Sequence, residues 1–204
     1  MKNIRDLIQK ALELQQSGLV EAQIADELNV SRETATWLLA HSPKEDLTQV
    51  PKDIYVNWSS IGRSSRRLGL MSSALCDLIS KSVNNSDTDI EVVVGVALSG
   101  VPIASLIAEE LDTELSVFQS SKHSSGGSGG MLSQNFSLVS GKKCIIVDDV
   151  ITTGSTIKEV ISILKSNKAI TTAIGVLIDK KGFDSIEGIP VCSLLRVSRV
   201  DKIE

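Results

Sequence analysis

The sequence predicts an α/β protein, in which a parallel β-sheet is covered by helices on both faces and a smaller, all-helical segment comes first. Two observations predict this fold class. From about Ile54 onwards, short runs of β-branched apolar residues alternate with segments of helical periodicity, and buried strands separated by helices are typical of parallel sheets. Ahead of that point, Asn3 to His41 show helical periodicity without a strand pattern.

The amino-terminal segment contains three predicted helices. In the first, apolar residues recur at three- and four-residue spacing, as on one face of a helix. They are Ile4, Leu7, Ile8, Ala11, Leu12 and Leu14. Ser17-Gly18 ends this helix, and two more are expected at Val20 to Leu28 and at Ser31 to Ala40. Pro43 prevents continuation, so we expect a helical domain at 1–42, a polar linker at 43–53 and a second domain at 54–204.

The larger segment alternates strands and helices along its length. Helices are expected at Ser64 to Ser82, Val101 to Leu111 and Ser155 to Asn167. Strands are expected at Val92 to Ala97, Leu115 to Phe118, Cys144 to Val147, Thr171 to Ile178 and Val191 to Val197. The polar, glycine-rich stretch from Ser120 to Ser137 is expected to be a loop.

Composition limits the class of function. The hydrophobic fraction is 42% and the aromatic fraction 3%, so the core must be largely aliphatic. A net charge of -4 argues against a protein coated in basic patches, although it does not exclude a local basic face. Cys76, Cys144 and Cys192 form no CxxC pair, which favours free thiols in a reducing compartment. No apolar run is long enough to span a bilayer, so we expect a cytoplasmic protein without a membrane partner.

A phosphate-binding loop is predicted where a buried strand ends at two adjacent carboxylates, Asp148 and Asp149. A loop of small residues then leads into a helix, whose N-terminus presents unpaired N–H groups and a partial positive charge. Gly154 lets the backbone approach a ligand closely. Hydroxyl donors are added by Thr152, Thr153, Ser155 and Thr156. Such a loop suits a phosphomonoester, and the two acids suit ribose hydroxyls or a Mg²⁺ ion.

A simpler interpretation is that Asp148-Asp149 caps the following turn and that the hydroxyl residues only start a helix. The complete order is more specific, because CIIVDDVITTGST, from Cys144 to Thr156, closely resembles the motif with which type I phosphoribosyltransferases bind phosphoribosyl pyrophosphate (PRPP). The resemblance implies the type I phosphoribosyltransferase fold over roughly Ile54 to Val200. It also implies that 152–156 bind PRPP together with Asp148 and Asp149, which would hold Mg²⁺ through the ligand.

A second stretch agrees with this resemblance. Gly95 to Ala104 reads as a strand, a tight loop and a helix start, and is similar to the pyrophosphate-binding loop of the same family. The similarity implies that the main-chain N–H groups of Leu98, Ser99 and Gly100 face the pyrophosphate. Ser120 to Gly130 takes the place of the family's mobile loop, which closes over the reacting centre. Within the family, the orotate branch is the most similar.

The chain departs from the orotate enzymes in three respects. Their mobile loop typically carries several lysines and arginines, whereas SSKHSSGGSGG offers Lys122 and His123. The first acid is Asp148 where the enzymes usually have Glu, and their Ser-Gly-x-x-Ser-Pro pattern is replaced here by NWSSIGRS, residues 57–64. Lys122 and His123 are therefore candidate catalytic residues only if the protein is an enzyme, and we expect slow or absent orotate turnover.

The amino-terminal helices match a helix-turn-helix. Its core and turn positions would be Ile24, Ala25, Leu28, Asn29, Val30, Ala35 and Leu38. Asn29 tolerates the left-handed backbone that the turn needs, and Ser31 caps the next helix. Residues expected to point outward toward base edges are Ser31, Arg32, Glu33, Thr36 and Trp37. The alternative is an ordinary helical hairpin that packs on the larger domain or pairs two subunits, and the acidic balance of Met1 to Ala40 weakens the DNA interpretation.

The order of the segments resembles a family of archaeal orotate phosphoribosyltransferase-like transcriptional regulators, linked to control of sugar catabolism. In that family a helix-turn-helix is followed by a segment like YVNWSSIGRSSRRL and then by the larger domain. The resemblance implies a homodimer that binds DNA and senses PRPP or another phosphorylated sugar or nucleotide. The competing hypothesis is an active Mg²⁺-dependent phosphoribosyltransferase for orotate or another base. Arg63, Arg66 and Arg67 either contact phosphates or form a solvated helix face.

Overall fold

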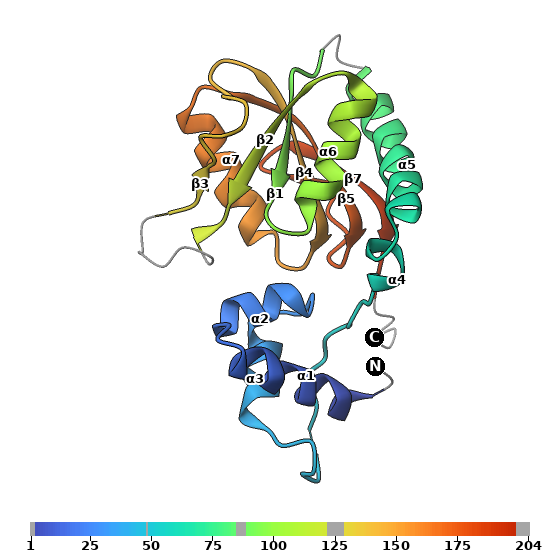
Figure 1. Ribbon diagram of the computed structural model, residues 1–204, viewed down its shortest axis with the longest axis vertical. Coiled ribbons are helices and arrows are strands. Elements are labelled where there is room, and N and C mark those ends of the chain that lie inside the picture. The colour runs from blue at the N-terminus through green and yellow to red at the C-terminus, as the bar shows by residue number, and fades with distance from the viewer. Residues whose placement is uncertain (1–2, 48, 85–88, 122–128, 199–204) are drawn as a thin grey trace, which may run out of the picture. The chain divides into compact units, whose positions relative to one another are not determined.

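The computed structural model describes residues 3–47, 49–84, 89–121 and 129–198 (Figure 1). The chain divides into two compact units, Met1–Trp58 and Ser59–Glu204. The smaller unit contains only helices, and the larger one is built around a β-sheet. Each unit has its own hydrophobic core.

Three helices form the smaller unit: α1 (Ile4–Gln16), α2 (Glu21–Glu27) and α3 (Arg32–Ala40). Asn3 caps α1, because its side chain accepts a hydrogen bond from the Asp6 backbone N–H. The apolar face predicted for the first helix contributes to a shared core. The buried members of that core are Leu7, Ile8, Ala11, Ile24, Ala25, Leu28, Val30, Ala35 and Leu38.

The segment that follows Pro51 also packs on the helical unit. Asp53 Oδ2 accepts a hydrogen bond of 2.7 Å from the Ser31 N–H at the start of α3, and Tyr55 packs against the helical core. These contacts explain why the smaller unit extends to Trp58. Asp53 belongs to the predicted linker and Tyr55 to the start of the predicted second domain.

The larger unit is a sheet of strand order β3-β2-β1-β4-β5-β7-β6 among the described residues. The strands are β1 (Val92–Val96), β2 (Glu114–Gln119), β3 (Met131–Leu132), β4 (Lys143–Ile151), β5 (Ile170–Asp179), β6 (Ser185–Ile186) and β7 (Ile189–Arg196). The five longer strands pair in parallel, and the two-residue strands β3 and β6 pair antiparallel at the edges. This arrangement confirms the predicted parallel sheet.

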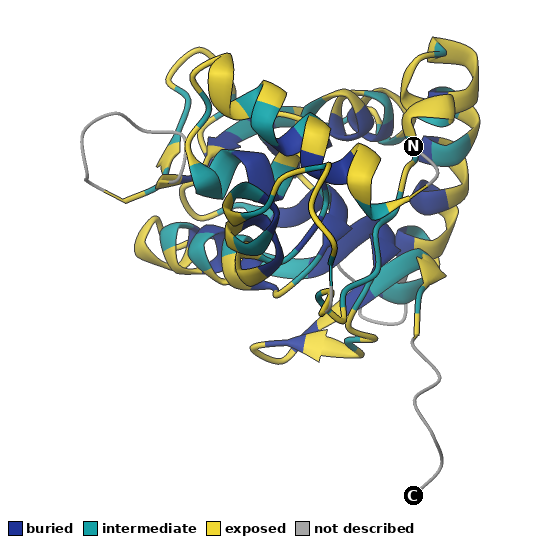
Figure 2. Cartoon of the chain, turned by 90° about the horizontal axis from the view of Figure 1, so that it is seen from below, coloured by how far each residue is buried: buried dark blue, intermediate teal, exposed yellow. Residues whose placement is uncertain are grey.

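Helices cover the sheet on both sides, as Figure 1 shows. The covering helices are α5 (Ser65–Asn84), α6 (Gly100–Leu111) and α7 (Ser155–Ser166), and the short helix α4 (Ser59–Gly62) packs on α5. α5 packs on β5 and β7, and α6 on β1 and β4. α7 contributes Ile157, Val160 and Ile161 to the core of the other face. Figure 2 shows burial concentrated on the central strands, and β1 is buried along its whole length.

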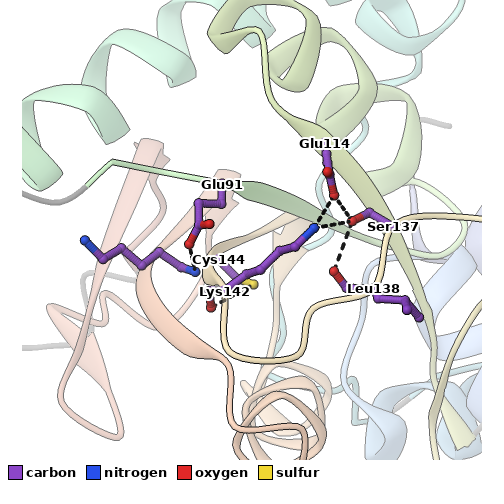
Figure 3. A network of polar contacts seen from close by, with 7 residues as sticks. Glu91, Glu114, Ser137, Leu138, Lys142 and Cys144 are labelled. Atoms are coloured by element: carbon purple, nitrogen blue, oxygen red, sulfur yellow. Dashed lines mark hydrogen bonds and ion pairs between the residues drawn. The ribbon is translucent and has the colours of Figure 1, made fainter.

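The amino ends of the strands are joined by a polar network, shown in Figure 3. Glu114, which begins β2, accepts hydrogen bonds from Lys142 and Ser137, and Glu91 accepts one from the Lys143 N–H at 2.8 Å. The Lys142 hydrogen bond, followed by that of Ser137, lowers the pKa of Glu114. Glu91, Glu114 and Lys142 of this network border a hollow of about 510 Å³. The network lies at the opposite edge of the sheet from the predicted phosphate loop.

No helix in the described part of the chain is long and apolar enough to cross a membrane.

Candidate phosphate-binding site

The two predicted acids lie within β4, which continues to Ile151, four residues beyond the predicted end of the strand. Asp149 is only 7% exposed, and Asp148 is half-buried. The Asp149 backbone N–H donates to Asp148 Oδ1 at 2.9 Å. Both acids therefore lie at the carboxyl edge of the sheet, where open parallel sheets bind their ligands.

The loop after β4 leads directly into α7. Gly154 is the residue before the helix and has a left-handed backbone, with φ 78°. Thr153 and Ser155 are exposed, and their hydroxyl oxygens lie 3.0 Å apart. The Ser155 N–H, at the first position of α7, donates to Thr153 Oγ1 at 3.4 Å, so the helix N-terminus and the hydroxyl groups of the loop lie together. This arrangement suits an anion with several oxygens.

The predicted pyrophosphate loop ends against β4 beside the first of the two acids. It connects β1 to α6, with a cis peptide bond between Ala97 and Leu98. Leu98 is 78% exposed, Ser99 is also exposed, and Gly100 is buried at the start of α6. A Cβ atom on Gly100 would lie 2.6 Å from Val147 O and 2.9 Å from Asp148 Cα. Because only hydrogen fits there, the start of α6 approaches β4 through the backbone of Gly100.

A third turn at this edge was not predicted as part of the site. Asp179, fully buried at the end of β5, accepts hydrogen bonds from the N–H groups of Lys181, Gly182 and Phe183 at 2.7 to 2.9 Å. The Lys180 N–H donates to Ile151 O at 3.0 Å, which fixes the turn beside the end of β4. Two lysines thus join the edge that carries Asp148 and Asp149. An Asp followed three residues later by Gly is a turn pattern, and could have indicated it.

Glu159 of α7 holds the described residues at the two ends of the segment 120–130. Its carboxylate accepts hydrogen bonds from Ser120 Oγ at 2.7 Å, the Ser121 N–H at 3.2 Å and the Gly130 N–H at 2.9 Å. Burial raises the pKa of Glu159, but these hydrogen bonds outweigh burial and leave that pKa below its ordinary value. The sequence did not single out Glu159. Lys122 and His123, the candidate catalytic residues, lie outside the described residues.

The acids of the loop fit a magnesium site of a particular kind. Among the described residues there is no group of three or more His, Cys, Asp or Glu side chains that could hold a metal ion. Mg²⁺, however, is commonly bound through one or two carboxylates together with phosphate oxygens and water. Asp148 and Asp149 would supply carboxylate oxygens to such a site, and the remaining ligands would come from a phosphorylated sugar and water.

The helical unit has its own set of predicted residues. Arg32, Glu33 and Thr36 are exposed on α3. Ser31 caps α3 by accepting from the Thr34 N–H. Arg32 Nε pairs with Glu21 Oε1 at 2.8 Å.

Trp37 does not point outward as expected. It is half-buried and packs against the helical core, and its ring stacks on His41 with centroids 4.1 Å apart. The two residues are four positions apart, so their side chains lie on the same face of the chain and the rings can stack. This stacking keeps the Trp37 ring from pointing outward.

A mostly parallel sheet of this strand order, with helices on both faces and the two candidate loops at its carboxyl edge, has the features of a type I phosphoribosyltransferase fold. Residues 69–182 match the family model described as phosphoribosyl transferase domain. The orotate phosphoribosyltransferase of Aeropyrum pernix superposes with a TM-score of 0.56 at 21% identity, over 74% of this chain and 84% of that one. An adenine phosphoribosyltransferase from Rhodothermus marinus gives 0.56 at 18% identity, over 74% and 91%. At these identities the likeness shows the fold, which confirms the prediction.

Similarity over the whole chain is found with curated transcriptional regulators. The transcriptional regulator GfcR of Methanosarcina mazei is 54% identical, over 98% of this chain and 100% of the relative. That of Archaeoglobus fulgidus is 43% identical over the same shares. The chain therefore belongs to the GfcR family of transcriptional regulators.

Proposed function

We propose that this protein binds DNA through its helical unit and senses PRPP or another phosphorylated sugar or nucleotide through its phosphoribosyltransferase-like domain. One observation carries the proposal: the relatives named transcriptional regulators match the chain over nearly its whole length, helical unit included. The compared enzymes of the same fold cover about 74% of the chain, whereas these relatives cover 98% of it.

The proposed effector site uses two loops and two acids at the carboxyl edge of the sheet. The 5-phosphate would accept hydrogen bonds from the hydroxyls of 152–156 and from the first-turn N–H groups of α7. Asp148 and Asp149 would accept from the ribose hydroxyls or hold Mg²⁺, which would neutralise charge on the pyrophosphate. The N–H groups of Leu98 to Gly100 would face that pyrophosphate.

The geometry of α2 and α3 supports the helix-turn-helix proposal. Asn29 adopts a left-handed backbone, with φ 53°, in the turn between them. Ala25 and Ala35 are buried in the shared core, where small side chains let two helices approach closely. α3 would then be the recognition helix, with Arg32, Glu33 and Thr36 facing base edges.

A homodimer is part of the proposal, because one short helix reads few bases and two half-sites are the usual solution. The expected DNA site is therefore two-fold related.

The test is to select genomic DNA fragments with the full-length protein and to measure affinity for the selected fragment. Arg32→Ala should weaken specific binding by about 1–3 kcal/mol if Arg32 reads a base. Arg32→Lys keeps the charge but loses the planar guanidinium, and should lose specificity too. Glu21→Gln is the matched control, since it breaks the same ion pair without removing Arg32. A protein that selects no fragment, or native affinity in both Arg32 variants, would refute this proposal.

The second candidate function is an active phosphoribosyltransferase. It is favoured by the assembled phosphate loops and by the lysines of the Asp179 turn. The test is pyrophosphate release from PRPP with orotate and with each common nucleobase. A turnover number near 1 per second, within the ordinary enzyme range, and its loss in Lys122→Ala, would favour the enzyme over the sensor.

A further inference from the structure

A cluster of three arginines at the start of the larger unit is used by neither the effector site nor the recognition helix. Arg63 follows α4, and Arg66 and Arg67 lie in the first turn of α5. The surrounding stretch from Ile54 to Cys76 contains no Asp, Glu or Lys. The cluster is therefore a region of positive charge without compensating acids in its own segment.

All three arginines are exposed. None forms an ion pair with another described residue within 4.0 Å, in contrast to Arg32, which pairs with Glu21. Arg67 Nε donates to Ser60 O at 2.5 Å. This bond joins the backbone of α4 to the first turn of α5, and leaves the terminal nitrogens of Arg67 available to a ligand.

The position of two of these charges opposes the stability of α5. A helix N-terminus carries partial positive charge, so cations in the first turn are unfavourable and anions favourable. The first turn of α5 has no acidic residue. The same charges become favourable when an anion binds there, because the guanidinium groups can then donate to it at the positive end of the helix.

The helical unit needs such a source of positive charge if it binds DNA. Residues 1–58 contain six Lys and Arg against nine Asp and Glu, a net charge of -3. Contacts to DNA phosphates supply most of the sequence-independent affinity, and they require cations. Arg63 follows the end of the acidic unit by five residues in the sequence.

We infer that Arg63, Arg66 and Arg67 form a contact surface for the phosphates of the DNA backbone. The inference rests on the proposed DNA-binding function and assigns a role to the larger unit in it. The surface supplies affinity that does not depend on sequence, whereas α3 supplies the base contacts. Lysine suits a phosphate as a point charge, so the surface requires positive charge more than it requires arginine.

The experiment measures the affinity of the full-length protein for its selected fragment and for random DNA by fluorescence anisotropy, over a range of salt concentrations. The test variant carries Arg63→Gln, Arg66→Gln and Arg67→Gln. A second variant replaces the same three arginines by lysine. The matched control loses three exposed cations elsewhere in the larger unit, through Lys81→Gln, Lys165→Gln and Lys168→Gln.

The glutamine variant should bind both DNAs at least tenfold more weakly at low salt. The slope of log K against log salt should become shallower by about 2–3, at about 0.9 per lost phosphate contact. The lysine variant and the control should keep the native slope, and the thermal midpoint of the glutamine variant should not fall. A native salt slope in the glutamine variant would refute this inference but not the proposed function. An equal loss of DNA affinity in the control variant would do the same. So would a glutamine variant that binds PRPP more weakly but DNA with native affinity. Failure of the native protein to select any DNA would refute the proposed function and, with it, this inference.

Discussion

Replacing Gly100 with alanine tests whether the two phosphate loops act as one site. The new methyl carbon would lie 2.6 Å from Val147 O, against 3.4 Å for an ordinary contact, so the two backbones must separate by 0.8 Å (3.4 − 2.6). Both nearest atoms belong to the backbone and cannot rotate away. Overpacking of this kind costs about 1–3 kcal/mol, and the helix preference of alanine returns up to about 1 kcal/mol. We therefore expect a net loss of stability of about 1–2 kcal/mol.

The same displacement should move the N–H groups of Leu98 to Gly100 away from Asp148 and lower PRPP affinity at least tenfold, about 1.4 kcal/mol. Calorimetric titration with PRPP and MgCl₂, together with thermal denaturation, measures both effects. Gly69→Ala is the matched control, since nothing lies within 4 Å of its added Cβ in the second turn of α5. It should raise stability by about 0.5–1 kcal/mol and leave binding unchanged. Native PRPP affinity in Gly100→Ala would refute the reasoning.

Three further predictions concern single groups. Changing Asp148 and Asp149 together to asparagine should weaken PRPP binding more than tenfold, about 1.4 kcal/mol or more, because charge-assisted hydrogen bonds are lost. Native PRPP affinity by calorimetry would overturn the assignment of these acids to the site. Asp77→Asn, which changes an exposed aspartate of α5, is the control. Glu159→Gln should destabilise the fold by about 1 kcal/mol at pH 7 in urea denaturation. The pKa of Glu159 is lowered in the folded protein, so its contribution to the free energy of unfolding is fully present above the unfolded pKa and is lost as pH falls through the folded pKa. The stabilities of the native protein and the variant should therefore converge in acid. A difference in stability that does not change with pH would contradict this. Burial, reinforced by the charge of Glu91, raises the pKa of the Cys144 thiol to about 12. At pH 8 this thiol should therefore react with a disulfide reagent roughly a thousandfold more slowly in the folded protein than in the denatured protein. Equal reaction rates would show that the thiol is exposed.

The parts of the fold that the sequence predicted are those encoded locally. The run of mostly β-branched residues from Val92 to Val96 forms the buried strand β1, as predicted. The helix after Gly154 starts at Ser155, also as predicted. The two-residue strands β3 and β6 show no periodicity, because two residues are too few to express one.

The parts of the site that could not be predicted depend on tertiary contacts. The approach of Gly100 to Asp148 follows from the pairing of β1 with β4, which are separated by almost fifty residues in sequence. Glu159 looks like one more helix acid until its three donors are brought to it from another segment. Trp37 fits an outward position by helical spacing, but stacking on His41 keeps it half-buried.

The central claim is that effector binding in one unit changes DNA binding in the other. The most direct test is the affinity of the full-length protein for its selected fragment with and without PRPP and MgCl₂. Allosteric coupling of about 1–3 kcal/mol predicts a change of at least about fivefold. The change should vanish in the Asp148→Asn, Asp149→Asn variant while its affinity without PRPP stays native. Repeating the titration with other phosphorylated sugars and nucleotides extends the test to the remaining effectors of the proposed class. Equal DNA affinity with and without saturating PRPP, or a change that persists in the double variant, would contradict the claim that PRPP is the effector.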